Sequence, residues 1–209
     1  MSAIMICGTR RLPPGAASLV GRVVGSTLAA GRSLVTGCAT GADAAAVSAT
    51  LAIGAASRLQ IMAVGGADGA GFAGRASAID VVQAAARAGA GVRWWAGGPA
   101  SLPIRSRLAK RSAAALQHTA MRGPGSGLVA IVTAPPPRHW SGSGPWWSCG
   151  SGTWSTVAAA AARGMRVVVL PASGPIALPS LPGTTGVWAP AGGGGVWAQA
   201  WAWAEKRLL

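Results

Sequence analysis

Four short segments of this 209-residue chain combine glycine with hydroxyl or arginine side chains in a way that suits anion binding. The first segment consists of Gly8, Thr9 and Arg10. Glycine lets the backbone approach a ligand closely, and the threonine hydroxyl and the arginine guanidinium can each bind a phosphate. We interpret this segment as part of a phosphate site, with a plain turn as the alternative.

The second segment, residues 36–43 with the sequence TGCATGAD, contains two glycines that allow a tight turn between a strand and a helix. Gly37 and Gly41 would let backbone N–H groups point at an anion. Asp43 could accept hydrogen bonds from a ribose or a base, or act as a general acid and base if the protein is an enzyme. The structural alternative is that Asp43 caps the following helix.

The third segment is basic. Arg105 and Arg107 are followed by Lys110 and Arg111, and residues 107 and 111 lie four apart, on one face of an expected helix. The neighbouring sequence offers no acidic residue to pair with them. Arg105 and Arg107 are therefore candidates for a clamp on phosphate or on a nucleic-acid backbone, with a solvated helix face as the alternative.

The fourth segment, residues 149–153 with the sequence CGSGT, leads into another expected helix. The first N–H groups of a helix have no partner within it, so small residues there form an anion cradle. Ser151 or Thr153 could instead cap the helix. The candidate ligand-binding residues of this segment are Gly150, Ser151, Gly152 and Thr153.

Tryptophan is unusually abundant, with ten residues against no tyrosine. Trp146 and Trp147 lie in a long loop beside the fourth segment, and they are candidates for stacking on a nucleotide base. The alternative is that GC-rich coding makes tryptophan the aromatic filler of the core.

The alternation of short apolar runs with alanine-rich stretches predicts an α/β fold, a Rossmann-like open parallel sheet flanked by helices. Ligands bind beyond the carboxyl ends of the strands in such sheets, where all four segments would fall. Expected strands cover residues 3–7, 33–36, 59–64, 91–95, 128–133 and 166–170, and expected helices cover 13–31, 43–57, 77–87, 103–119 and 153–163.

The chain is long enough for a single domain. We expect residues 1–171 to form the nucleotide-binding domain and residues 172–209 to be a Gly/Pro/Trp-rich C-terminal extension that packs on it. Trp197 and Trp201 are spaced i, i+4, which predicts a last helix over residues 196–207.

The four segments together resemble the SLOG superfamily, which includes the DprA/Smf DNA-processing proteins, the LOG proteins and YspA-like domains. Its pattern of GTR-like, TGGAxGxD-like, RNR-like and GxxSGT-like elements stands here, in the same order, as GTR, TGCATGAD, RSR and CGSGT. Cys38 and Ser106 depart from the pattern. The catalytic glutamate of LOG proteins falls at Thr156, so the resemblance argues against LOG-type catalysis.

The amino-acid composition limits the kinds of molecule that we expect this protein to bind. Eighteen Lys and Arg against four Asp and Glu give a net charge of +14, which attracts polyanions, although the scarcity of lysine also fits GC-rich coding. Three cysteines and two histidines form no metal-binding pattern, so we expect free thiols, no metal and no cofactor. We see no signal peptide or membrane span and expect a cytoplasmic protein without a membrane partner.

Three functions follow from these residues. The leading hypothesis is a SLOG-like sensor or binding domain for a nucleotide or nucleotide-derived phosphate ligand. One alternative is a DprA-like protein that binds single-stranded DNA. The other is an enzyme related to LOG proteins that cleaves an N-glycosidic or phosphoribosyl bond, although Thr156 makes us lean against an enzyme. The resemblance also makes a homodimer plausible.

Overall fold

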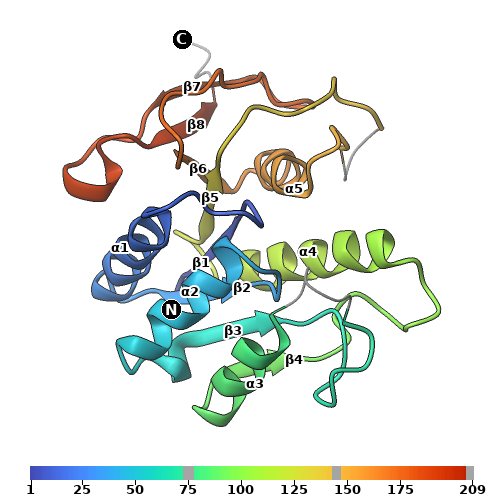
Figure 1. The fold of residues 1–209 in the computed structure, drawn as a ribbon. Helices are drawn as coiled ribbons and strands as arrows, with labels where there is room; N and C mark the ends of the chain where they lie inside the picture. The colour runs from blue at the N-terminus through green and yellow to red at the C-terminus, as the bar shows by residue number, and fades with distance from the viewer. Residues whose placement is uncertain (73–77, 143–146, 206–209) are drawn as a thin grey trace.

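Six parallel strands and an antiparallel C-terminal pair form one sheet (Figure 1). The computed structural model describes residues 1–72, 78–142 and 147–205. The strands are β1 (Ala3–Gly8), β2 (Ser33–Thr36), β3 (Leu59–Met62), β4 (Gly91–Arg93), β5 (Gly127–Val132), β6 (Arg166–Pro171), β7 (Gly186–Pro190) and β8 (Trp201–Glu205). Their order in the sheet is β4-β3-β2-β1-β5-β6-β8-β7. The predicted Rossmann-like α/β class is confirmed.

Helices cover both faces of the sheet, as Figure 1 shows. Ile4 and Ile6 of β1 pack in the layer that contains the first three helices, whereas Ala3 and Met5 pack in the layer of the last two. This alternation follows from the two-residue period of a strand and explains why the central strands are apolar throughout. The helices are α1 (Ala16–Ala29), α2 (Ala42–Ala52), α3 (Ile79–Arg87), α4 (Ile104–Ala120) and α5 (Gly152–Ala161).

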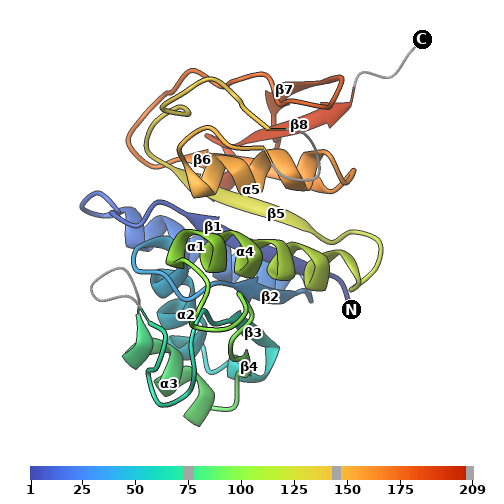
Figure 2. The same ribbon diagram turned by 90° about the vertical axis from the view of Figure 1, so that its right-hand side faces the viewer.

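The order of the strands reverses between β1 and β5, which lie side by side in parallel. The chain leaves β1 toward α1 on one face and leaves β5 toward α5 on the other. This switch point is where open α/β sheets bind ligands, outside the carboxyl ends of the strands. In Figure 2 the loop after β1 projects at the left-hand side of the sheet, while the N-terminus lies at the right. We call these two sides the carboxyl edge and the amino edge.

The predicted last helix is wrong. Trp201 and Trp203 lie in β8, antiparallel to β6 and opposite Val169 and Val167, respectively. The alternation of tryptophan with alanine suits a strand, and pairing with β6 satisfies backbone groups that would otherwise face water. Trp197 lies instead in a short 3-10 turn (Gly195–Trp197), where its indole N–H donates to Ser26 of α1.

Tryptophans fasten the C-terminal strands to α5. Trp154 packs edge-to-face on Trp188 at 6.5 Å between ring centroids, and Trp188 packs on Trp203 at 5.0 Å. The indole of Trp154 donates to the carbonyl of Ala134, and that of Trp188 donates to Pro179. Within the described residues, no helix is both long and apolar enough to cross a bilayer.

Candidate functional site at the carboxyl edge

The loop after β1 is built into the switch point. The N–H of Thr9 donates to the carbonyl of Ile131 at the end of β5, over 2.9 Å. A Cβ at Gly8 would lie 2.5 Å from that carbonyl oxygen and 2.7 Å from the Cβ of Ala42. Only glycine fits there, so Gly8 lets β1, β5 and α2 approach one another.

The turn after β2 uses its N–H groups within the protein. The N–H of Ala42 donates to the carbonyl of Thr9 over 3.0 Å, and that of Ala39 donates to Asp43 over 3.2 Å. Gly41 has a φ of 76°, and a Cβ there would overlap the carbonyl of Thr9. These two donors of the turn, expected to face an anion, are thus already occupied.

Asp43 and Arg111 form a buried ion pair, with Oδ2 and Nη1 3.1 Å apart. The sequence next to Arg111 offers no acidic residue, and the partner lies 68 residues away in the sequence. The guanidinium also covers Gly37, where a Cβ would overlap Nη1. An arginine of the protein therefore occupies the place beside Gly37 that we had expected for a ligand phosphate.

Burial raises the pKa of the Asp43 carboxyl, because the charged form loses its hydration. The Arg111 guanidinium, the N–H of Ala39 and the more distant Arg10 all oppose that rise. Proton transfer by Asp43, as the enzyme hypothesis requires, would have to break a buried ion pair.

The third predicted segment divides into an exposed and a buried part. Arg105 is exposed at the start of α4, as is Lys110 farther along. Arg107 is buried, and its Nη1 donates to the carbonyls of Val64 and Gly71 over 3.3 and 2.8 Å. Arg107 thus ties the loop after β3 to α4, whereas Arg105 remains free to meet a ligand.

The fourth segment begins α5. Ser151 is the N-cap, and its Oγ accepts from the N–H of Trp154 over 3.4 Å. Gly152 is exposed and Thr153 half-buried in the first turn, where N–H groups have no partner within the helix. Gly150, with φ of 80°, lies against Arg138; a Cβ there would be 3.4 Å from Cδ of that arginine.

Thr156, at the position of the LOG glutamate, is buried and donates to the carbonyl of Gly152 over 2.8 Å. Its hydroxyl is thus engaged within α5. No group of three His, Cys, Asp or Glu able to hold a metal occurs among the residues that the structure describes.

Among the residues that the structure describes, four exposed arginines lie in segments that follow the carboxyl ends of strands: Arg10, Arg11, Arg105 and Arg138. We call them the carboxyl-edge arginines. Sequence reasoning missed Arg11 and Arg138; the signal for both was their place in a loop that directly follows a central strand.

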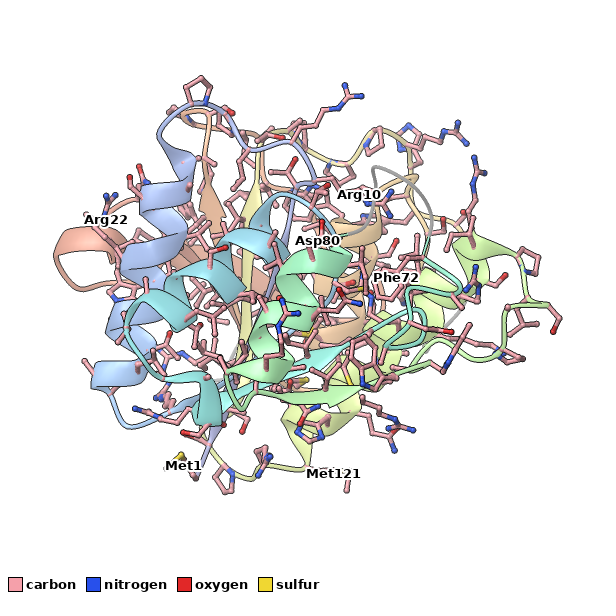
Figure 3. All side chains as sticks on the ribbon, turned by 60° about the horizontal axis from the view of Figure 1, so that its bottom comes forward. Met1, Arg10, Arg22, Phe72, Asp80 and Met121 are labelled. Atoms are coloured by element: carbon pink, nitrogen blue, oxygen red, sulfur yellow. The ribbon has the colours of Figure 1, made fainter. Side chains whose placement is uncertain are left out.

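The loop that carries Arg10 has a defined shape. The hydroxyl of Thr9 donates to the carbonyl of Arg11 over 3.1 Å and accepts from its N–H over 3.2 Å. Thr40 donates to the carbonyl of Arg10 over 3.4 Å. Hydrogen bonds between threonine hydroxyls and the backbone therefore hold the loop, and the guanidinium of Arg10 is exposed (Figure 3).

Of the two predicted stacking residues, Trp146 lies outside the described residues. Trp147 is half-buried, and a Cβ built on Gly183 would lie 3.5 Å from its Nε1. The neighbouring Trp140 donates to the carbonyl of Ser180 over 3.0 Å. Tryptophans thus join the loop after β5 to the loop after β6.

Comparison with known proteins gives a likeness in fold only. No family model and no curated protein matches the sequence. DNA processing protein A from Streptococcus pneumoniae superposes with a TM-score of 0.56 and 20% identity over 82% of this chain and 50% of its own. The Helicobacter pylori protein gives 0.55 and 19% over 81% of this chain and 65% of its own.

The chain shares its fold with DNA processing protein A. It spans about two thirds of the length of the Helicobacter pylori DNA processing protein A and half of that from Streptococcus pneumoniae. The likeness agrees, at the level of the fold, with the resemblance to the SLOG superfamily. The Helicobacter pylori protein binds single-stranded DNA.

Proposed function

We propose that this protein binds single-stranded DNA across the carboxyl edge of its sheet. The observation that carries the proposal is the set of four exposed carboxyl-edge arginines around a switch point whose interior is already filled. The buried Asp43–Arg111 pair occupies the space beside Gly37.

Because the N–H groups of the turn after β2 are bonded within the protein, a DNA strand is a better ligand than a single nucleotide. A deep phosphate cradle needs free N–H groups, but those of Ala39 and Ala42 are bonded within the protein. Exposed guanidinium groups instead suit phosphates that pass along a surface, each contact adding counterion release to the affinity.

Charge supports the same ligand. The chain carries a net charge of +14, and at the carboxyl edge the four exposed carboxyl-edge arginines outnumber the exposed acidic residues that the structure describes there. Asp43 is buried in its ion pair, while Asp68 and Asp80 are exposed near this edge. A polyanion would meet a positive field there. The fold shared with a protein that binds single-stranded DNA adds support.

A nucleotide-derived phosphate ligand is the second candidate, and one feature favours it. The first turn of α5, with Gly152 exposed beside Thr153, follows Gly150, where a Cβ would lie 3.4 Å from Cδ of Arg138. A helix N-terminus and one guanidinium would suffice for a single phosphate.

The deciding test is the anisotropy of a labelled oligothymidylate, titrated with protein between about 50 and 200 mM salt. We expect saturable binding that weakens steeply with salt and that is lowered by Arg10→Ala and Arg138→Ala. Arg22→Ala is the matched control, because Arg22 is exposed on α1, well apart from Arg10 in Figure 3.

Two outcomes would contradict the proposal. Equal loss of binding in Arg10→Ala and Arg22→Ala would mean that only net charge matters. If mononucleotides bind saturably and the oligonucleotide does not, the nucleotide-derived ligand becomes the function.

A further inference from the structure

A second basic site lies at the opposite, amino edge of the sheet. A cavity of about 260 Å³ opens between the starts of β2, β3 and β4 and the end of α4. This volume is smaller than that of a pocket for a drug-sized molecule and suits a small ion. Its polar side chains are those of Ser33, Ser57, Arg58, Gln60, His118 and Arg122.

The charge of this cavity is uncompensated. Arg58 and Arg122 line it, and Arg93 lies close enough to act on His118. No carboxylate among the described side chains lines it. The described acidic side chains, Asp43, Asp68 and Asp80, all follow the carboxyl ends of β2 or β3.

The end of α4 does not account for these cations. A cation near a helix C-terminus offsets the partial charge of its free carbonyls. Here three of the last four carbonyls are already bonded, since the N–H groups of Met121, Arg122 and Gly123 donate to Gln117, Thr119 and Ala120, respectively. Three arginines exceed what the helix end requires.

Some hydrogen-bond donors of these side chains are unused or could be released to bind a ligand. Arg58 donates from Nη2 to the carbonyl of Arg32, and its buried Nε has no acceptor within the described part of the chain. Arg122 donates from Nε to Nε2 of His118 over 3.4 Å. That bond needs the neutral imidazole, so a protonated His118 would release both groups toward the cavity.

We propose that this amino-edge cavity binds a small tetrahedral oxyanion, of the sulfate or phosphate class, through Arg58, Arg122 and protonated His118. The ion supplies the negative charge that the three side chains lack. Its binding is coupled to the uptake of one proton by His118, because the imidazolium donates where the neutral ring accepts.

The coupling has a direction. Burial, together with the charges of Arg122 and Arg93, lowers the pKa of His118. Arg58 lines the same cavity, and the amino group of Met1 is the remaining charge there. A bound dianion offsets these charges and raises the pKa again, so the ion binds more tightly as the pH falls.

The test is a sulfate titration followed by the imidazole proton resonances, at constant ionic strength adjusted with chloride. Sulfate keeps its charge across the neutral range, so any pH dependence belongs to the protein. We expect the His118 resonance to move saturably, with affinity several-fold higher at about pH 5.5 than at about pH 7.5, on either side of the ordinary histidine pKa. His139, in the loop after β5, is the internal comparison.

Two variants at the cavity test its residues. Arg122→Gln should abolish the saturable shift of the His118 resonance. His118→Gln lacks that resonance, so its sulfate binding is followed by the rise in melting temperature with sulfate, which should be weaker than in the parent and independent of pH. Arg22→Gln and Arg10→Ala should respond as the parent does, and unchanged melting temperatures would exclude misfolding. A parallel, non-saturating drift of both histidines, or an unchanged response in Arg122→Gln, would overturn the proposal.

A competition experiment identifies the source of the oxyanion. A mononucleotide that displaces sulfate would identify the phosphate of a nucleotide as the ligand class. If inorganic phosphate competes and the mononucleotide does not, the ligand is the free ion. We expect Arg10→Ala to weaken DNA binding and to leave the sulfate response unchanged, so this variant distinguishes failure of the amino-edge site from failure of DNA binding at the carboxyl edge.

Discussion

Oδ2 of Asp43 lies 3.1 Å from Nη1 of Arg111, with only 5% and 7% of the two side chains exposed. Asp43 belongs to the first turn of α2 and Arg111 to α4, so the pair joins helices from opposite faces of the sheet around the carboxyl end of β2. It connects the two layers at the point where the candidate site begins.

Removing one partner of this pair should cost far more than removing both. Asp43→Ala leaves a buried guanidinium without compensation, and we expect a loss of about 3–5 kcal/mol in the free energy of unfolding. The double variant Asp43→Leu/Arg111→Met should recover most of that loss. Urea unfolding followed by circular dichroism measures both; a single variant within about 1 kcal/mol of the parent would contradict a structural role for the pair.

Gly37→Ala should destabilise the protein although its backbone could accept the side chain. The new Cβ would overlap Nη1 of Arg111, and we expect a cost of about 1–3 kcal/mol. Gly25→Ala is the control, because nothing lies within 4 Å of that position in α1; it should stabilise by up to about 1 kcal/mol. Thermal melts compare the two, and equal effects would contradict the prediction.

Arg10 and Arg107, both predicted as phosphate ligands, should behave differently. Arg107→Met leaves the carbonyls of Val64 and Gly71 without their donor, and we expect a loss of about 1–3 kcal/mol in stability. Arg10→Ala should change stability by less than about 0.5 kcal/mol. It should lower the slope of log affinity for single-stranded DNA against log salt by about 0.7. An unaltered slope would mean that Arg10 contacts no phosphate.

Much of the scaffold could be predicted because its signals are local. Residues 3–7 and 167–170 are uninterrupted apolar runs, as expected of strands buried on both faces. The glycines after β1 and β2 correctly marked tight turns. Local pattern therefore sufficed for the parallel strands and for the edge on which the candidate segments fall.

The remainder depends on contacts between distant segments. Asp43 looked like a cap or a ligand because nothing near it in the sequence reveals Arg111, and Arg107 looked exposed because its carbonyl partners come from another loop. The strand β8 was mistaken for a helix because Trp197 and Trp201 have helical spacing. The alternation of tryptophan with alanine fits a strand as well, and pairing with the edge of β6 favours the strand over the helix.

The tryptophan contacts predict that removing the ring of Trp154 lowers the stability of the protein much more than removing the ring of Trp201. Trp154 is buried, packs on Trp188 and donates to Ala134, so Trp154→Ala should cost about 3–5 kcal/mol. Trp201, the first residue of β8, is 37% exposed. Its substitution by alanine should therefore lower the free energy of unfolding clearly less. Chemical denaturation of both variants provides the comparison, and similar costs would mean that Trp154 does not anchor the C-terminal strands.

The cysteines make stability fall at high pH. Burial raises the pKa of Cys7 and of Cys38, so both thiols stay protonated in the folded protein after they would ionise in the unfolded chain. Their contribution is fully present below about pH 9, the ordinary thiol value, and is lost as the pH rises further. The sequence contains no tyrosine to mask this effect.

Urea unfolding at a series of pH values above about 8.5 tests the thiol effect. The Cys7→Ala/Cys38→Ala variant should show a flatter decline than the parent. Identical slopes in the two proteins would assign the decline to other groups.

The pairing of β8 with β6 also bears on the order of folding during synthesis. The central strand β1 gains its second neighbour only when β5 has emerged, and β6 keeps an open edge until residues 201–205 follow. Sheets closed by such distant pairings form slowly and expose strand edges meanwhile. The apolar edge of β6 is therefore open to non-native pairing until residues 201–205 are available to cover it.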